Sequence, residues 1–317
     1  MNKRENVLAV IQGRPVDYTP ASFSMHFPKS EAFGEAGVKS HLDFYEKTNV
    51  DIMKIMNEHL VPDFGAIRVP SDWNKIPSFS LKDKFLSDQV DFVKRILDES
   101  DEATFSLGTI HGICASSIHP IEARYGYVPV RELQIAHLRE DPTPFLDACK
   151  RITDAMCLLT EAVLEAGLDG IYYAALGGEK HFMTDKEFAL AIEPFDKQIL
   201  QVAKEHGSCN FVHICKENLN MDRYRSYADL IDVVNWGVYE THYSLEQGRK
   251  LFPEATIMGG LANRSGVLVE GTEEELKNAV KKVIADFGPK KFILGADCTL
   301  ATEMDYSRIR QAVQAAR

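Results

Sequence analysis

Short apolar runs alternate with longer amphipathic stretches along most of the chain. The apolar runs are five to seven residues long, and runs of this length are typical of buried strands rather than helices. Eight of them are predicted as strands: residues 21–26, 51–56, 104–110, 170–175, 209–215, 232–236, 256–260 and 291–295.

The stretches between these runs carry the periodicity of amphipathic helices. The clearest start signal belongs to the last of them, where Thr272 can cap the helix and Glu275 can complete a capping box. Acidic residues in that first turn also suit the positive end of the helix dipole. Helices are predicted over residues 38–48, 86–99, 144–166 and 272–287.

The alternation of strands and helices predicts one α/β domain, a single (β/α)8 barrel that covers residues 1–317 and includes a short N-terminal helix. A doubly wound open sheet is the alternative. Neither G-x-G-x-x-G nor G-x-x-x-x-G-K-[ST] follows a predicted strand, so the usual nucleotide-binding loops are missing. Barrel enzymes build their sites from the loops after the strands. We therefore expect the main pocket at that rim, near residues 62–77 and 111–127.

Composition narrows the classes of partner and the compartment. The chain has 36 Lys and Arg against 47 Asp and Glu, a net charge of −11, and this acidic balance argues against a nucleic-acid partner. The chain has no run of about 18 apolar residues, the length that a membrane-spanning helix needs, and its N-terminus lacks an apolar signal core. We therefore expect a cytoplasmic protein. Six cysteines are too few for a disulfide scaffold, and in that compartment they are expected to be thiols or metal ligands.

A metal site is predicted at the ends of two strands. His213 and Cys215 alternate on the fifth predicted strand and therefore share a face. Cys298 comes 83 residues after Cys215, at the end of the eighth predicted strand, and a barrel would return it to the same rim. One His and two Cys with an open fourth position are typical of catalytic zinc, with donor atoms within about 4 Å of one another. The alternative is a core histidine with buried strand cysteines.

The same residues carry a family resemblance that spans nearly the whole chain. Residues 4–20, 212–215, 258–263, 271–275 and 292–298 resemble the corresponding segments of the uroporphyrinogen decarboxylase superfamily. The resemblance implies the (β/α)8 barrel. Within this superfamily, H-x-C followed by a distant Cys is similar to the zinc site of the corrinoid-dependent thiol methyltransferases. It therefore implies His213, Cys215 and Cys298 as Zn²⁺ ligands, a thiol as acceptor, and methylcobalamin or a related corrinoid, supplied by a partner corrinoid protein, as methyl donor.

Two departures from the family pattern bear on the activity. The decarboxylases carry an arginine-rich N-terminal segment and an Asp after the second strand. This chain lacks the arginine-rich segment, and Asn57 stands about where that Asp would fall. Porphyrinogen, which carries many carboxylates, is therefore a poor match as the substrate of this acidic chain. The related methyltransferases offer a fourth zinc ligand, a Glu from the end of the sixth strand. Here the nearest acid is Glu240, and either its carboxylate or a water is expected to fill the position.

Further residues near strand ends complete the predicted site. Catalytic or ligand-orienting roles are assigned to Glu240, Asn57 and Asp297, and contacts with a small-molecule substrate or a corrin ring to His26, His111, Tyr173 and Trp236. Two other functions remain open. One is a lyase that decarboxylates a smaller carboxylic acid with Asn57, Glu58 and rim histidines, and the other is a non-catalytic metal- or corrinoid-binding protein.

Overall fold

Eight parallel strands form one sheet that curls into a nearly closed barrel. The computed structural model describes residues 1–317, and the strands follow the order β1-β8-β7-β6-β5-β4-β3-β2. Between β1 and β2, the Asp51 N–H donates to the Ala21 carbonyl at 2.9 Å. The (β/α)8 fold predicted from the sequence is confirmed. The strands are β1 Ala21–Ser22, β2 Ile52–Ile55, β3 Phe105–His111, β4 Gly170–Ala175, β5 Cys209–Ile214, β6 Val233–Trp236, β7 Thr256–Leu261 and β8 Phe292–Ala296.

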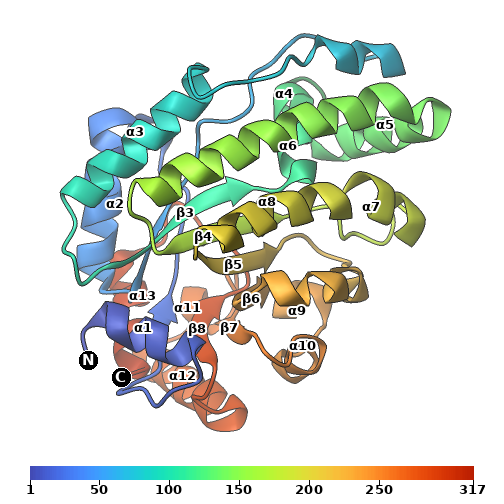
Figure 1. Cartoon of the computed structure of the whole chain (residues 1–317). Helices are drawn as coiled ribbons and strands as arrows, with labels where there is room; N and C mark the ends of the chain where they lie inside the picture. Colours follow the sequence, from blue (N-terminus) through green and yellow to red (C-terminus); the bar gives the residue numbers. More distant parts are fainter.

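Helices surround the strands on the outside (Figure 1). The longest, α6, packs against α3 on one side and α8 on the other. Thr272 caps α12 and forms the predicted capping box with Glu275. The α-helices are α1 Lys3–Ile11, α2 Gly34–Thr48, α3 Lys84–Asp98, α4 Ile113–Tyr125, α5 Tyr127–Glu140, α6 Pro142–Glu165, α7 Asp185–Ala191, α8 Glu193–Glu205, α9 Val238–Thr241, α10 Leu245–Leu251, α11 Val267–Glu270, α12 Glu273–Phe287 and α13 Tyr306–Ala315, and the 3-10 helices are η1 Lys29–Glu31, η2 Pro70–Lys75 and η3 Met221–Leu230.

The first strand is shorter than predicted. It pairs with β8 only at Ala21 and Ser22, although the sequence run continues to residue 26. Beyond it the chain leaves the ladder and returns once, where Met25 forms an isolated bridge with Leu300. The residues after Ser22 therefore belong to the rim rather than to the barrel wall.

The barrel interior changes from apolar to polar along the strands. Ile52, Phe211 and Val233 lie in an apolar cluster that fills the interior. Alternate residues of a strand face the same side. Two positions further toward the carboxyl ends of β2, β5 and β6, the inward face therefore carries Lys54, His213 and Asn235. The polar layer lies on the side where barrel enzymes bind their substrates.

A buried carboxylate ties the outer layer together. Asp196 of α8 is fully buried and accepts hydrogen bonds from the Tyr173 hydroxyl at 2.5 Å, the Ile113 N–H at 3.0 Å and the Tyr227 hydroxyl at 3.1 Å. Burial raises the pKa of Asp196 to about 7, although these hydrogen bonds partly oppose the shift. The carboxyl group thus joins α8 to β4, α4 and η3.

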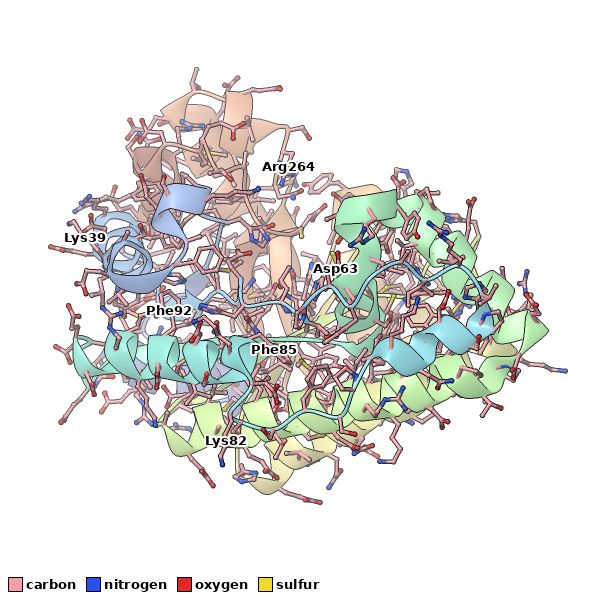
Figure 2. All side chains as sticks on the ribbon, turned by 90° about the horizontal axis from the view of Figure 1, so that it is seen from above. Lys39, Asp63, Lys82, Phe85, Phe92 and Arg264 are labelled. Atoms are coloured by element: carbon pink, nitrogen blue, oxygen red, sulfur yellow. The ribbon has the colours of Figure 1, made fainter.

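The loop between β2 and α3 is long and is held against α4. Arg124 of α4 pairs with Asp63 of this loop, with 2.8 Å between nitrogen and oxygen. In Figure 2 the thin segment labelled at Asp63 crosses the middle of the view above the helix that carries Phe85 and Phe92 and continues to the green helices at the right. None of the helices combines the length and the apolar composition that a membrane span requires.

The largest of the five main hollows does not lie at the rim where the main pocket was predicted. It measures about 640 Å³. Residues 13–19, Pro289 and Lys290, which precede strands, line it together with Ala316, which directly follows the terminal helix α13. It is therefore at the amino-terminal end of the barrel, and the prediction of a dominant rim pocket is wrong. The rim has smaller hollows because long side chains such as Lys54 and Tyr172 fill its centre.

Candidate metal centre

Three side chains predicted as ligands converge at the carboxyl end of the barrel. His213 belongs to β5, Cys215 follows that strand directly, and Cys298 comes two residues after β8. Their donor atoms all lie within 4.8 Å of one another, and the two sulfurs are 4.0 Å apart. Two sulfurs bound tetrahedrally to one Zn²⁺ at about 2.3 Å lie roughly 3.8 Å apart. The arrangement therefore needs little adjustment to hold a single ion.

The histidine is fixed in the orientation that a metal ligand requires. Its Nδ1 lies 2.6 Å from the side-chain oxygen of Asn235, whose amide nitrogen donates to the Met258 and Ala296 carbonyls at 3.0 and 3.1 Å. Because that amide nitrogen is already committed, the oxygen accepts, and Nδ1 carries the proton. The lone pair is then on Nε2, which is buried and has no hydrogen-bond partner. A ligating histidine is commonly held in this way by a second residue.

The two thiols interact strongly with each other. The hydrogen bond between them lowers the pKa of Cys298 and raises that of Cys215, and burial adds to the increase at Cys215. The positive charge of Lys54 also favours the Cys298 thiolate. The pair therefore releases its first proton readily and holds its second, and a bound cation would favour loss of both.

Asn235 offers a direct test of this arrangement. The Asn235→Ala variant is expected to bind Zn²⁺ about 10–100-fold more weakly, because His213 loses the acceptor that fixes its tautomer and ring orientation. The measurement is a competition titration against a zinc chelator. The matched control is Asn210→Ala, since Asn210 is also a buried strand asparagine that donates to two carbonyls, those of Leu200 and Leu230, but at the other end of β5. Equal zinc affinities in the two variants would contradict the assigned role.

The sequence interpretation missed three residues of the centre. Asn235, Lys54 and Tyr172 surround the cluster: the Tyr172 ring stacks on His213 at 5.8 Å, and the Lys54 ammonium lies 3.8 Å from the Tyr172 ring centroid. Burial lowers the pKa of Lys54 to about 8. A Lys and an Asn inside otherwise apolar strands were the signals available, because buried polar groups need partners.

Two acidic residues predicted for the site lie beside the cluster. The Asp297 carboxylate accepts the N–H of Tyr239 at 2.8 Å at the start of α9, the short helix that carries Glu240. Its other oxygen is buried without a partner, and burial raises its pKa to about 6. Burial and the neighbouring Cys298 raise the pKa of Glu240. Asp297 is thus placed to position the Glu240 segment, and Glu240 lies near the cysteines.

Three other predicted residues lie at the rim. His26 is exposed and bonds Glu58 at 2.6 Å, while His111 ends β3 and packs edge-on against His119 with 4.8 Å between ring centroids. The Asn57 side chain is buried and accepts the His59 N–H at 3.1 Å, so its oxygen shapes the turn after β2. Their proposed contacts with substrate or catalytic roles remain predictions.

Two residues predicted as substrate contacts do not face the barrel interior. Tyr173 and Trp236 are both fully buried in the layer between the barrel wall and the helices. The Tyr173 hydroxyl bonds Asp196, and the Trp236 indole N–H donates to the Tyr243 carbonyl at 2.8 Å. They alternate with the inward-facing Tyr172 and Asn235, so they point away from the barrel interior.

The chain is a (β/α)8 barrel, and its His-Cys-Cys cluster lies at the carboxyl ends of the strands. Barrel enzymes place their active sites at this rim. Residues 54–317 match the family model described as uroporphyrinogen decarboxylase (URO-D). The chain therefore belongs to the uroporphyrinogen decarboxylase family, as its sequence motifs suggested. No curated protein is similar enough in sequence to count as a match.

Solved structures with the same fold include a methyltransferase and a methionine synthase. A methyltransferase from Methanosarcina mazei superposes with a TM-score of 0.75 at 14% identity, covering 100% of this chain and 98% of the other. A B12-independent methionine synthase from Shewanella sp. W3-18-1, in complex with selenomethionine, gives 0.59 at 13% identity, covering 94% and 96%. At these identities, the comparisons establish the shared fold.

Proposed function

We propose that the protein is a zinc-dependent methyltransferase that moves a methyl group from a corrinoid carrier to a thiol. The observation that carries this proposal is the unpartnered, buried Nε2 of His213, held by Asn235 within 4.8 Å of two cysteine sulfurs. A buried polar atom without a partner is costly, and a metal ion would satisfy it. The methyltransferase fold of the Methanosarcina neighbour is consistent with this function.

The donor set fits Zn²⁺. His213, Cys215 and Cys298 would hold the ion and leave one position open, with Glu240 or a water as the resting occupant. When bound, zinc supplies a thiolate nucleophile at neutral pH, because it lowers the pKa of a coordinated thiol. Asn235 keeps His213 oriented, Asp297 holds the α9 segment, and Lys54 contributes positive charge beside the sulfurs.

The methyl donor would approach the barrel mouth from outside. In the transfer, a sulfur–carbon bond forms as the bond between methyl and carrier breaks, and its electron pair stays on the carrier. A protein carrier needs an apolar surface to dock on, since exposed apolar patches commonly mark interaction sites. Several large apolar side chains that are at least 38% exposed belong to segments that follow strands: Phe33, Leu60, Val69, Val128, Tyr239 and Val269.

Metal content and turnover test the proposed function together. Purified protein is expected to hold one Zn²⁺ per chain and, when supplied with free methylcobalamin, to methylate at least one member of a panel of small thiols. Metal analysis and the loss of the methylcobalamin absorption spectrum are the measurements. Protein without stoichiometric zinc, or zinc-loaded protein that transfers no methyl group, would overturn the proposal. If the protein then releases carbon dioxide from a small carboxylic acid, the decarboxylating lyase becomes the leading interpretation.

A further inference from the structure

A hollow at the rim is lined by Lys216, the residue that follows Cys215 in the chain. It measures about 320 Å³, at the small end of the range for ligand sites. Four successive strand-end segments line it, with Tyr127 after β3, Phe182 after β4, Lys216 after β5 and Glu240 after β6. Tyr239, which precedes Glu240, donates its N–H at 2.8 Å to Asp297, which precedes Cys298. The hollow therefore borders the two segments that carry Cys215 and Cys298.

The hollow presents charged groups of both signs that lack partners in the protein. The Lys216 ammonium lies 3.9 Å from the Tyr127 ring centroid and forms no salt bridge, and Glu217 forms none either. Glu179, which also lines the hollow, is different, because it bonds the Tyr127 hydroxyl and faces the buried Arg131 at 3.9 Å. Since Glu240 is the proposed resting occupant of the open metal position, the two charged groups left for a ligand are the adjacent Lys216 and Glu217.

The backbone holds Lys216 in an unusual conformation. Its φ is +87°, in the left-handed region that residues other than glycine rarely adopt. The flanking chain is fixed on both sides, by the bond from the Cys215 N–H to the Ala175 carbonyl at 2.9 Å and by the bridge between Glu179 and Leu219. Strain of this kind is commonly retained at functional sites. At Lys216, the left-handed backbone conformation occurs together with the contact between the side-chain ammonium and the Tyr127 ring.

We propose that this hollow binds the methyl acceptor, and that the acceptor is a small zwitterionic thiol, an α-amino acid with its thiol on a short side chain. Its carboxylate would meet Lys216, its ammonium would meet Glu217, and Tyr127 and Phe182 would flank its aliphatic part. This inference rests on the proposed function of the metal centre. The hollow has more carboxylates than ammonium groups, which disfavours a purely anionic thiol, while a purely cationic thiol would lie beside Lys216.

The atoms balance in the transfer to such an acceptor. The thiol loses its proton to solvent and becomes a thiolate, and the sulfur forms a bond to the methyl carbon. The bond between the methyl group and its carrier breaks with the electron pair remaining on the carrier, so the products are a thioether amino acid and the demethylated carrier. The charges recognised by Lys216 and Glu217 do not change during the reaction.

Calorimetric titration of the zinc-loaded full-length protein tests the acceptor class without turnover. The probes are homocysteine, 3-mercaptopropionate, cysteamine and 2-mercaptoethanol, which are zwitterionic, anionic, cationic and neutral. Homocysteine is expected to bind at least roughly tenfold more tightly than each of the others, because each lacks one or both charged contacts. Lys216→Met and Glu217→Gln should each remove about tenfold of its affinity while zinc content stays unchanged.

Lys180→Met is the matched control, because Lys180 is an exposed lysine on the neighbouring loop with no salt bridge. It should leave homocysteine binding unchanged. Equal binding of all four thiols, tightest binding of 3-mercaptopropionate, or unchanged homocysteine affinity in Lys216→Met and Glu217→Gln overturns the acceptor class and leaves the proposed function standing. If the wild-type protein binds no zinc or transfers no methyl group, the proposed function itself is overturned.

Discussion

Cys298→Ser is expected to lower the affinity of the protein for Zn²⁺ by more than roughly 100-fold, because even the loss of an outer hydrogen-bond partner costs about 10–100-fold and this change removes a ligand. Serine is nearly isosteric with cysteine but is a poor ligand for zinc, since structural and catalytic zinc sites use Cys, His, Asp and Glu. Cys298 lies after the end of β8 and is only partly buried, so the substitution opens no core cavity. Metal analysis after dialysis measures the effect, and thermal unfolding of the metal-free proteins should show little change.

Cys209→Ser provides the matched control. Cys209 is also partly buried and begins the same strand that carries His213, but it is at the opposite end of the barrel. This variant should retain one zinc per chain and its methyl-transfer activity, whereas Cys298→Ser should lose most of both. Full zinc occupancy in Cys298→Ser would exclude the cluster as the metal site.

Asp196→Asn is expected to change how the free energy of unfolding depends on pH. Burial raises the pKa of Asp196 to about 7 in the folded protein, from an ordinary value of 3.8. Between these values the folded state binds the proton more tightly than the unfolded state does, so stability falls as pH rises from about 4 to 7. The full span of about three pH units corresponds to roughly 4 kcal/mol, at 1.36 kcal/mol per unit. Asparagine carries no ionisable group and therefore removes this loss.

Urea unfolding at several pH values measures the difference between the two proteins. The wild type should lose stability relative to Asp196→Asn as pH rises through this window, and the difference should stop growing above about pH 7. Groups common to both proteins, including Asp297, cancel in the comparison. A difference that stays constant from pH 5 to 8 would show that Asp196 is ionised throughout in the folded protein.

The main features of the fold and the metal cluster were predictable because they follow from simple geometry. Alternation places His213 and Cys215 on one face of a strand, and parallel strands in a barrel bring their carboxyl ends, and so Cys298, to one rim. Seven of the eight strands lie within a residue of their predicted bounds. The exception is β1, whose pairing depends on Leu294 and Gly295 of β8, far away in the sequence.

The errors come from strands that are buried on both faces. Such strands show continuous apolar runs instead of a clear alternation, so the sequence does not indicate which residues face the interior. Tyr172 and Tyr173 are adjacent and chemically identical, yet only Tyr172 points into the barrel. The same ambiguity made Trp236 look like a substrate contact when Asn235 is the inward residue. Hollows depend on how long side chains such as Lys54 pack, and local sequence patterns do not encode that packing.

The short first strand leaves the barrel wall with a seam between β1 and β2. No ladder joins these two strands, and Asp51 links their edges by accepting the Ala21 N–H at 2.8 Å, the Tyr18 hydroxyl at 2.8 Å and an Arg317 nitrogen at 3.1 Å. Regions with few backbone bonds open locally at lower free energy than the rest of a protein. The barrel wall should therefore open locally at this seam first. Amide hydrogens around the seam should exchange with solvent before those of β3 to β7.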